Sequence, residues 1–218
     1  MKVLHIGKYY PPYAGGMEHF LADLHNSLCN SGIKSSILVH RYNSDKISQK
    51  EEHDNLYQVP ILGTLLYTPV CPLFPFVLNR TIKKIEPDIL HLHMPNISAF
   101  WTMALSCARH IPWIIHWHSD VIPSEIDKRM VLAYKLYKPF ESFLLKKAKK
   151  IIVTSAPYLN TSKPLSFFQY KCQVVPLGID PKRFNKIEIY KNKIWSNNKY
   201  KILAIGRLTY YKGFKNLY

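Results

Sequence analysis

Short apolar runs alternate with longer segments of helical periodicity along most of the chain. Residues 2–6 (KVLHI) have the length and composition of a buried strand. Residues 16–31 carry leucines and a phenylalanine at helical spacing, and Gly32 follows as a helix C-cap. The same criteria predict strands over residues 35–40, 55–59, 88–93, 112–118, 150–154, 173–176 and 201–206, and helices over residues 72–85, 98–109 and 128–149.

This alternation predicts an α/β fold: a Rossmann-like parallel sheet with helices on both faces. Ligands of such sheets bind where the loops gather, at the carboxyl ends of the strands. Residues 1–181 are predicted to form one domain. Residues 182–199 are basic and polar with no periodic pattern, which is typical of a linker. Residues 200–218 would then begin a second domain.

Residues 55–79 carry no charge, so a membrane span has to be considered. Pro60, Pro69, Pro72 and Pro75 argue against one, because each would remove a helical hydrogen bond that lipid cannot replace. We predict instead an apolar loop and a short helix, which either pack on the domain or touch a bilayer surface.

The chain is strongly basic, with 30 Lys and Arg residues against 14 Asp and Glu and a formal net charge of +16. This excess favours a polyanionic partner, and charge alone leaves nucleic acid, anionic lipid and phosphorylated substrates open. No nucleic-acid-binding motif is present, which disfavours the first. The predicted helix over residues 128–149 mixes lysines with aromatic residues and so favours an anionic membrane surface, although its apolar side also fits an ordinary buried stripe.

The four cysteines are scattered and form no C-x-x-C pair. A disulfide framework is therefore not expected, and a reducing compartment is. The apolar stretch at the N-terminus is too short for a signal peptide. We expect a cytoplasmic protein.

A glycine pair precedes the first predicted helix. Gly15 and Gly16 would let backbone N–H groups and the helix dipole approach a phosphate or sugar oxygen closely. A tight turn that needs two glycines is the alternative. The dinucleotide fingerprint G-x-G-x-x-G is absent, which disfavours an NAD or FAD protein.

Histidines recur at alternate positions on two predicted strands. His91 and His93 share one face of their strand, and His116 and His118 share one face of the next. A zinc site is therefore physically possible. We expect instead that His91 and His116 are buried with satisfied hydrogen bonds, and that His118, in the string HWHSD with Asp120, bonds a ligand.

Two cations follow the predicted strand over residues 201–206. Arg207 and Lys212 could clamp a diphosphate, the arginine as a bidentate fork and the lysine as a point charge. Solvated surface cations are the alternative in so basic a chain.

The order of motifs resembles that of the retaining family-4 glycosyltransferases of GT-B fold. The matching strings are PPYAGGMEHF, DILHLHMP, HWHSD, KKIIVTS, VVPLGID and AIGRLTYYKGF, and they span nearly the whole chain. The last of these, with HWHSD and VVPLGID, is similar to transferases that extend O-antigen on a lipid carrier.

The resemblance implies a role for each matching residue. It implies a nucleotide-sugar donor, GDP-mannose in our interpretation, and a lipid-linked or saccharide acceptor at the inner face of the cell membrane, with no metal. The implied catalytic residues are His118 and Asp120, the donor-binding residues are Gly15, Gly16, Arg207 and Lys212, and the acceptor-side residues are Glu18 and His93.

The chain also departs from the family pattern. Family members continue for about 150 further residues, a second domain of ordinary size, and carry an E-x7-E motif there. We therefore expect little or no transfer activity from these 218 residues alone. A zinc-dependent hydrolase, a non-catalytic membrane- or polyanion-binding domain, and an inactive acceptor-binding half remain as alternatives, and the sequence leaves the oligomeric state open.

Overall fold

The computed structural model describes residues 1–13, 15–42, 55–66, 68–123, 128–178, 202–206 and 213–216. The chain divides into two compact units, Met1–Ile179 and Asp180–Tyr218. The sheet described below belongs to the first unit. In the second, the described residues include a short 3-10 helix, η5 (Phe214–Asn216).

The first unit is built on a parallel sheet whose strand order is β3-β2-β1-β6-β7-β8-β9. The strands are β1 (Lys2–Ile6), β2 (Lys34–Arg41), β3 (Leu56–Pro60), β6 (Ile89–Met94), β7 (Trp113–Trp117), β8 (Lys150–Val153) and β9 (Cys172–Val174). The chain runs outward from β1 to β3 and then returns to place β6 on the other side of β1. This reversal creates a topological switch point between β1 and β6. The α/β, Rossmann-like prediction is confirmed.

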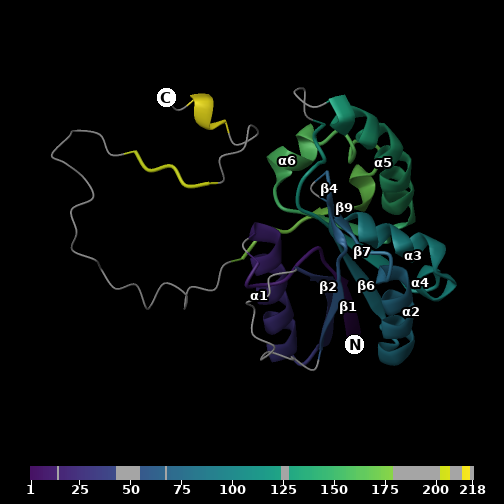
Figure 1. Cartoon of the computed structure of the whole chain (residues 1–218). Coiled ribbons are helices and arrows are strands. Elements are labelled where there is room, and N and C mark those ends of the chain that lie inside the picture. Colours follow the sequence, from purple (N-terminus) through teal and green to yellow (C-terminus); the bar gives the residue numbers. More distant parts are fainter. Residues whose placement is uncertain are drawn as a thin grey trace, which may run out of the picture. The chain divides into compact units, whose positions relative to one another are not determined.

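Helices cover both faces of the sheet, and Figure 1 shows α1 on one side and α2, α3 and α4 on the other. The helices of the first unit are α1 (Gly16–Asn30), α2 (Phe74–Ile85), η1 (Ile97–Phe100), α3 (Trp101–Ala104), α4 (Ser106–Arg109), α5 (Lys128–Lys147), α6 (Ala156–Thr161) and η2 (Gln169–Lys171). The predicted helices over residues 16–31, 72–85 and 128–149 therefore form with nearly the expected bounds.

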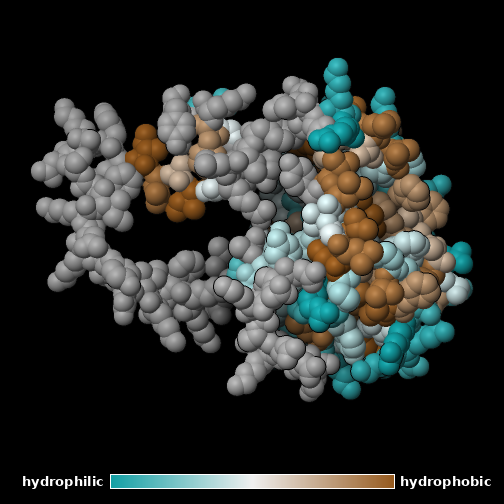
Figure 2. All heavy atoms as spheres, viewed as in Figure 1, coloured by the Kyte–Doolittle hydropathy of each residue, from teal (hydrophilic) through white to brown (hydrophobic). Residues whose placement is uncertain are grey.

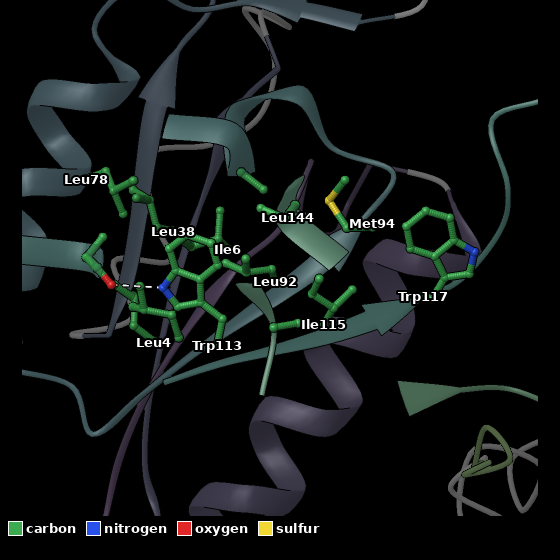
Figure 3. Packing of buried hydrophobic residues seen from close by; sticks show 14 of the residues in the cluster. Leu4, Ile6, Leu38, Leu78, Leu92, Met94, Trp113, Ile115, Trp117 and Leu144 are labelled. Carbon is green, nitrogen blue, oxygen red and sulfur yellow. Dashed lines mark hydrogen bonds between the residues drawn. The ribbon is translucent and has the colours of Figure 1, made fainter. Parts of the chain in front are cut away.

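The two faces of the sheet differ in chemistry because side chains alternate along each strand. Leu4 and Ile6 of β1 point into the main hydrophobic core, which includes Trp113 and Ile115 of β7. Figure 3 shows this packing and the hydrogen bond from the Trp113 indole nitrogen to the Ala108 carbonyl, 2.9 Å long. The intervening position, His5, belongs to the opposite face. That face carries a smaller apolar cluster and a group of histidines beneath α1.

Helix α1 packs closely on the end of β1 because Gly7 has no side chain. A Cβ atom at Gly7 would lie 2.5 Å from Cδ2 of Leu21 and 3.1 Å from Cγ1 of Val39. At its other end the helix closes as predicted, since Gly32 adopts φ of 78° and the Ile33 amide donates to the Leu28 carbonyl. Gly7 and Gly32 are therefore required for different reasons: Gly7 for the close approach of α1 to the sheet, and Gly32 for a positive φ at the end of α1.

The helix predicted over residues 98–109 is wrong as a single element. It is divided into η1, α3 and α4, because Leu105 takes extended dihedral angles (φ −86°, ψ 120°) between the last two. Leu105 packs against the main core. Partial burial of this side chain thus accompanies a break that helical periodicity alone does not reveal.

The apolar segment over residues 55–79 contains more strand than expected. Besides β3 it forms an antiparallel hairpin of β4 (Gly63–Leu65) and β5 (Thr68–Val70) before α2 begins at Phe74. Among the residues with described structure, no helix has both the length and the hydrophobicity required to cross a bilayer.

The strand predicted over residues 201–206 is not found: its described part, residues 202–206, has no strand structure. A strand is defined by its ladder of hydrogen bonds to a neighbour. The described residues of the second unit include no strand with which this segment could pair.

Candidate functional site

The candidate site lies at the carboxyl ends of β1, β6 and β7, next to the switch point of the sheet. Gly15 precedes α1 in the loop after β1, His93 is near the end of β6, and His118 directly follows β7. The His118 amide donates to the Met94 carbonyl over 3.0 Å, which continues the β6–β7 pairing by one residue. The structure therefore brings His93, His118 and the start of α1 to the edge where open parallel sheets bind ligands.

Three histidines form a continuous row across the sheet. Nδ1 of His5 lies 3.2 Å from Nε2 of His93, and Nδ1 of His93 lies 3.1 Å from Nε2 of His118. The corresponding ring centroids are 5.5 Å and 5.4 Å apart. In each pair the centroid distance is longer than the N···N distance by about the sum of the two centroid-to-nitrogen radii. The two nitrogens therefore lie on the line between the ring centroids and point at each other. We call these three residues the imidazole chain.

Burial keeps the imidazole chain neutral. Desolvation lowers the pKa of His5 and of His118 to about 3 and that of His93 well below its usual value, and neighbouring histidines add to each effect. A neutral imidazole carries one N–H donor and one acceptor nitrogen. At neutral pH each ring in the chain therefore donates in one direction only.

His91 and His116 are buried as predicted, but the expectation that their hydrogen bonds are satisfied is wrong. Nε2 of His91 and both ring nitrogens of His116 are buried with no hydrogen-bond partner among the described residues. His116 instead stacks on His118, with ring centroids 4.4 Å apart and planes 14° from parallel. Its strand position forces it under Phe20 of α1, whose ring centroid is 4.6 Å away.

Two groups of histidines are close enough together to be considered as a metal site: His5, His91 and His93, and His93, His116 and His118. Zinc would hold each nitrogen at about 2.0–2.1 Å with the lone pairs converging at a tetrahedral angle. Here Nδ1 of His93 and Nε2 of His118 lie 3.1 Å apart and point at each other, whereas two ligands of one zinc ion would both point at a position beside the line that joins them. The orientation of this pair fits a hydrogen bond.

Helix α1 brings its first turn to the histidines. Phe20, one turn after Gly16, lies with its ring edge toward His118, and the ring centroids are 5.4 Å apart. The N-cap residue Gly15 supplies no side-chain hydrogen bond to the first-turn amides. The backbone N–H groups of the first turn therefore lie at the site, and no side chain of the N-cap residue bonds to them.

Gly16 is not required by the local fold. A Cβ atom built on it meets no atom within 4 Å, and its backbone is outside the left-handed region. The tight-turn explanation for this glycine therefore fails. Close approach of a ligand to the helix N-terminus stays a prediction for this glycine.

Asp120 is held firmly by three hydrogen bonds to one oxygen. Its Oδ1 accepts from Nε1 of Trp117 at 2.8 Å, from the Tyr158 hydroxyl at 2.5 Å and from Oγ of Ser162 at 2.8 Å. These bonds join the loop after β7 to helix α6. Asp120 thus fixes the segment that carries His118.

The other predicted site residues divide into two groups. Glu18 is buried in the first turn of α1, 7% exposed, on the helix that covers the histidines. Arg207 and Lys212 lie outside the described residues. The structure therefore places Gly15, Gly16 and Glu18 at the start of α1, and His93, His118 and Asp120 at or just after the ends of β6 and β7.

Sequence reasoning missed His5, Phe20, Tyr158 and Asn96. His5 lies opposite His91 in the β1–β6 register, and Asn96 donates to the Gly7 carbonyl at 2.9 Å, joining the ends of the same two strands. A single histidine in the run KVLHI was an available signal for His5. Phe20 and Tyr158 carried no signal, because their roles depend on helices packing against distant strands.

The strand order and this edge of the sheet define the class: a Rossmann-like α/β domain with its ligand edge at the switch point, as in each half of a GT-B protein. The model of Glycosyltransferase Family 4 matches residues 14–183, and the chain belongs to that family.

Two relatives align with almost the whole chain. The O-antigen chain mannosyltransferase C of Escherichia coli is 26% identical over 98% of this chain and 56% of its own length. The D-rhamnosyltransferase WbpZ of Pseudomonas aeruginosa is 25% identical over 98% of this chain and 54% of its own length. The chain thus spans about half the length of these relatives.

Among solved structures, sucrose-phosphate synthase from Thermosynechococcus elongatus superposes with a TM-score of 0.56 and 18% identity, over 83% of this chain and 49% of that one. At this identity the likeness shows the fold alone.

Proposed function

We propose that this chain forms part of a glycosyltransferase that moves a hexose from a nucleotide sugar to a lipid-linked or saccharide acceptor in O-antigen synthesis. One observation carries the proposal: the unobstructed first turn of α1 lies beside His118 at the switch point of the sheet, where Phe20 contacts that histidine. Family membership and two relatives named as O-antigen and rhamnosyl transferases support the reaction class.

The donor diphosphate would bind to the amides that begin α1. These amides and the helix dipole favour negative charge, and the absence of side chains at Gly15 and Gly16 leaves them accessible. Arg207 and Lys212 would neutralise the charge of the leaving diphosphate. The main requirement of such a transfer is to stabilise the negative charge that develops on the leaving group. Fixed cations can do this without a metal ion.

The transferred sugar would contact His118, with Asp120 keeping its loop in place, and the acceptor would lie nearer Glu18 and His93. GDP-mannose is the proposed donor, since the Escherichia coli relative is named as a mannosyltransferase. We further propose that the anomeric configuration is retained, as the resemblance to retaining enzymes implies.

A lipid-linked acceptor would require contact with the inner face of the cell membrane, and helix α5 offers a suitable surface. Leu132, Leu136, Phe140 and Phe143 recur every three or four residues and are each more than half exposed. Lys135, Lys138, Lys146 and Lys147 are exposed on the same helix. Figure 2 shows hydrophobic atoms gathered on the viewed face of the first unit with polar atoms around them. An apolar stripe flanked by lysines suits the surface of an anionic bilayer.

Calorimetric titration of GDP, UDP and their sugar conjugates into the chain tests the donor proposal. We expect binding of one nucleotide class, abolished in an Arg207→Ala/Lys212→Ala variant. A Lys149→Ala/Lys163→Ala variant removes the same charge at exposed positions and should bind like the parent chain. Absence of binding to the parent chain, or equal weakening in both variants, would overturn the assignment of the donor site.

A further inference from the structure

The imidazole chain can be polarised in only two ways. If His5 donates, Nδ1–H of His5 bonds Nε2 of His93, and Nδ1–H of His93 bonds Nε2 of His118. If His118 donates, every proton lies on the other nitrogen. Because each ring has one proton when neutral, the whole chain must follow one direction, and the choice at one end decides the tautomer at the other.

The buried end of the chain decides between them. Nε2 of His5 is buried without a hydrogen-bond partner among the described residues, and His5 is fully buried. Donation from His118 would leave a buried N–H group there with no acceptor. Donation from His5 leaves only an unused lone pair, and orphaned buried N–H groups are the rarer of the two in proteins.

We propose that His5 is a positioning residue that acts through His93 to hold His118 as the Nδ1–H tautomer. Nε2 of His118 then accepts from His93 and is unavailable as a base, whereas Nδ1–H is left as a donor at the less buried end of the chain. The ligand group that this donor recognises is an oxygen acceptor, such as a sugar hydroxyl or a phosphate oxygen. That last step rests on the proposed function.

Imidazole 15N spectra of the histidine-labelled chain at neutral pH test the tautomer without any ligand, and a His118→Asn variant assigns the signals. We expect His118 to be protonated on Nδ1 in the parent chain. His5→Leu should lose this preference, and His5→Asn, whose amide can donate from the position of Nδ1, should restore it.

Protonation of His118 on Nε2 in the parent chain would overturn the proposal. So would an unchanged His118 tautomer in a His5→Leu variant that retains the backbone spectrum of the fold. Stoichiometric binding of added Zn²⁺ with loss of both inter-histidine hydrogen bonds would also overturn it, in favour of a metal site. Because these readouts use no nucleotide sugar, the tautomer assignment and the glycosyltransferase proposal can fail separately.

Discussion

The hydroxyl of Tyr158 donates a 2.5 Å hydrogen bond to Oδ1 of Asp120, and so ties helix α6 to the loop that carries His118. Burial, with further contributions from the Asp120 carboxylate, raises the pKa of Tyr158 and keeps it a donor. The two residues are 38 positions apart, so the bond joins the loop after β7 to a helix that follows β8.

Removing this donor should destabilise the fold. We expect Tyr158→Phe to lower the free energy of unfolding by about 1–3 kcal/mol, as for other hydrogen bonds to charged groups. Urea unfolding measures the change. Tyr170→Phe, at a residue that is 76% exposed, is the control and should leave stability unchanged. Equal stability of both variants would show that the Asp120 network does not contribute.

Two glycines close together in the chain should respond oppositely to alanine. Gly7→Ala should lower the free energy of unfolding by about 1–3 kcal/mol, since its Cβ atom would lie 2.5 Å from Leu21. Gly16→Ala has open space and should keep or slightly raise stability. Gly16→Ala should weaken donor binding although its fold stays intact. Titration calorimetry measures the binding. Normal donor binding by this variant would exclude close approach of a ligand to Gly16.

The buried histidines predict acid sensitivity. An unfolded histidine titrates near its ordinary pKa of 6.5, whereas the pKa of folded His5 is about 3 and that of folded His116 about 4. Between the folded and unfolded pKa values of each histidine, the unfolded state binds more protons than the folded state. The contribution of these histidines to stability should therefore be constant above pH 6.5 and fall as the pH is lowered, by about 1.4 kcal/mol per pH unit for each such group.

His116→Phe removes the contribution of one buried histidine to this pH dependence of stability. It should make the decline below pH 6.5 shallower by the contribution of one histidine, and should not reduce stability at pH 7.5, because both nitrogens it removes are unpaired. His110→Asn at an exposed position is the control. Urea titrations at several pH values measure both slopes, and identical slopes in the parent chain and His116→Phe would contradict a buried neutral His116.

Glu141 predicts the opposite pH dependence. Burial raises its pKa from 4.5 to about 7, and its Oε1 has no partner among the described residues. Its stabilising effect is therefore fully present below pH 4.5 and is lost as the pH rises through about 7. Glu141→Gln should be more stable than the parent chain at pH 8.5 but not at pH 5, whereas the exposed Glu86→Gln should match the parent at both. Equal curves for Glu141→Gln and the parent would refute the raised pKa.

Helix α5 predicts binding to anionic vesicles. Leu136→Ser/Phe140→Ser should reduce co-sedimentation with phosphatidylglycerol vesicles, because it removes apolar area from the exposed stripe. Phe167→Ser/Tyr170→Ser removes exposed aromatic residues elsewhere and should bind like the parent chain. Binding should be weak on phosphatidylcholine. Unchanged sedimentation of the α5 variant would exclude this helix as the membrane contact.

Local sequence patterns were enough to predict the strands of the large sheet, three long helices and the strand face shared by His91 and His93 and by His116 and His118. These features depend on neighbours within a few residues: period-two alternation along KVLHI and DILHLHM, helical spacing after Gly16, and a glycine that ends α1. For the same reason the sequence predicted that the glycine pair, Glu18, His93, His118 and Asp120 lie next to strand ends, because they belong to short strings there.

The contacts between those residues depend on the three-dimensional fold. The contact between His5 and His93 joins positions 88 residues apart, and it exists because β6 returns to pair with β1. Phe20 lies over His118 because Gly7 lets α1 approach the sheet. Leu105 interrupts a periodic helix where its partly buried side chain packs against the core. Strand order and packing minimise free energy over the whole domain, so no local pattern contains them.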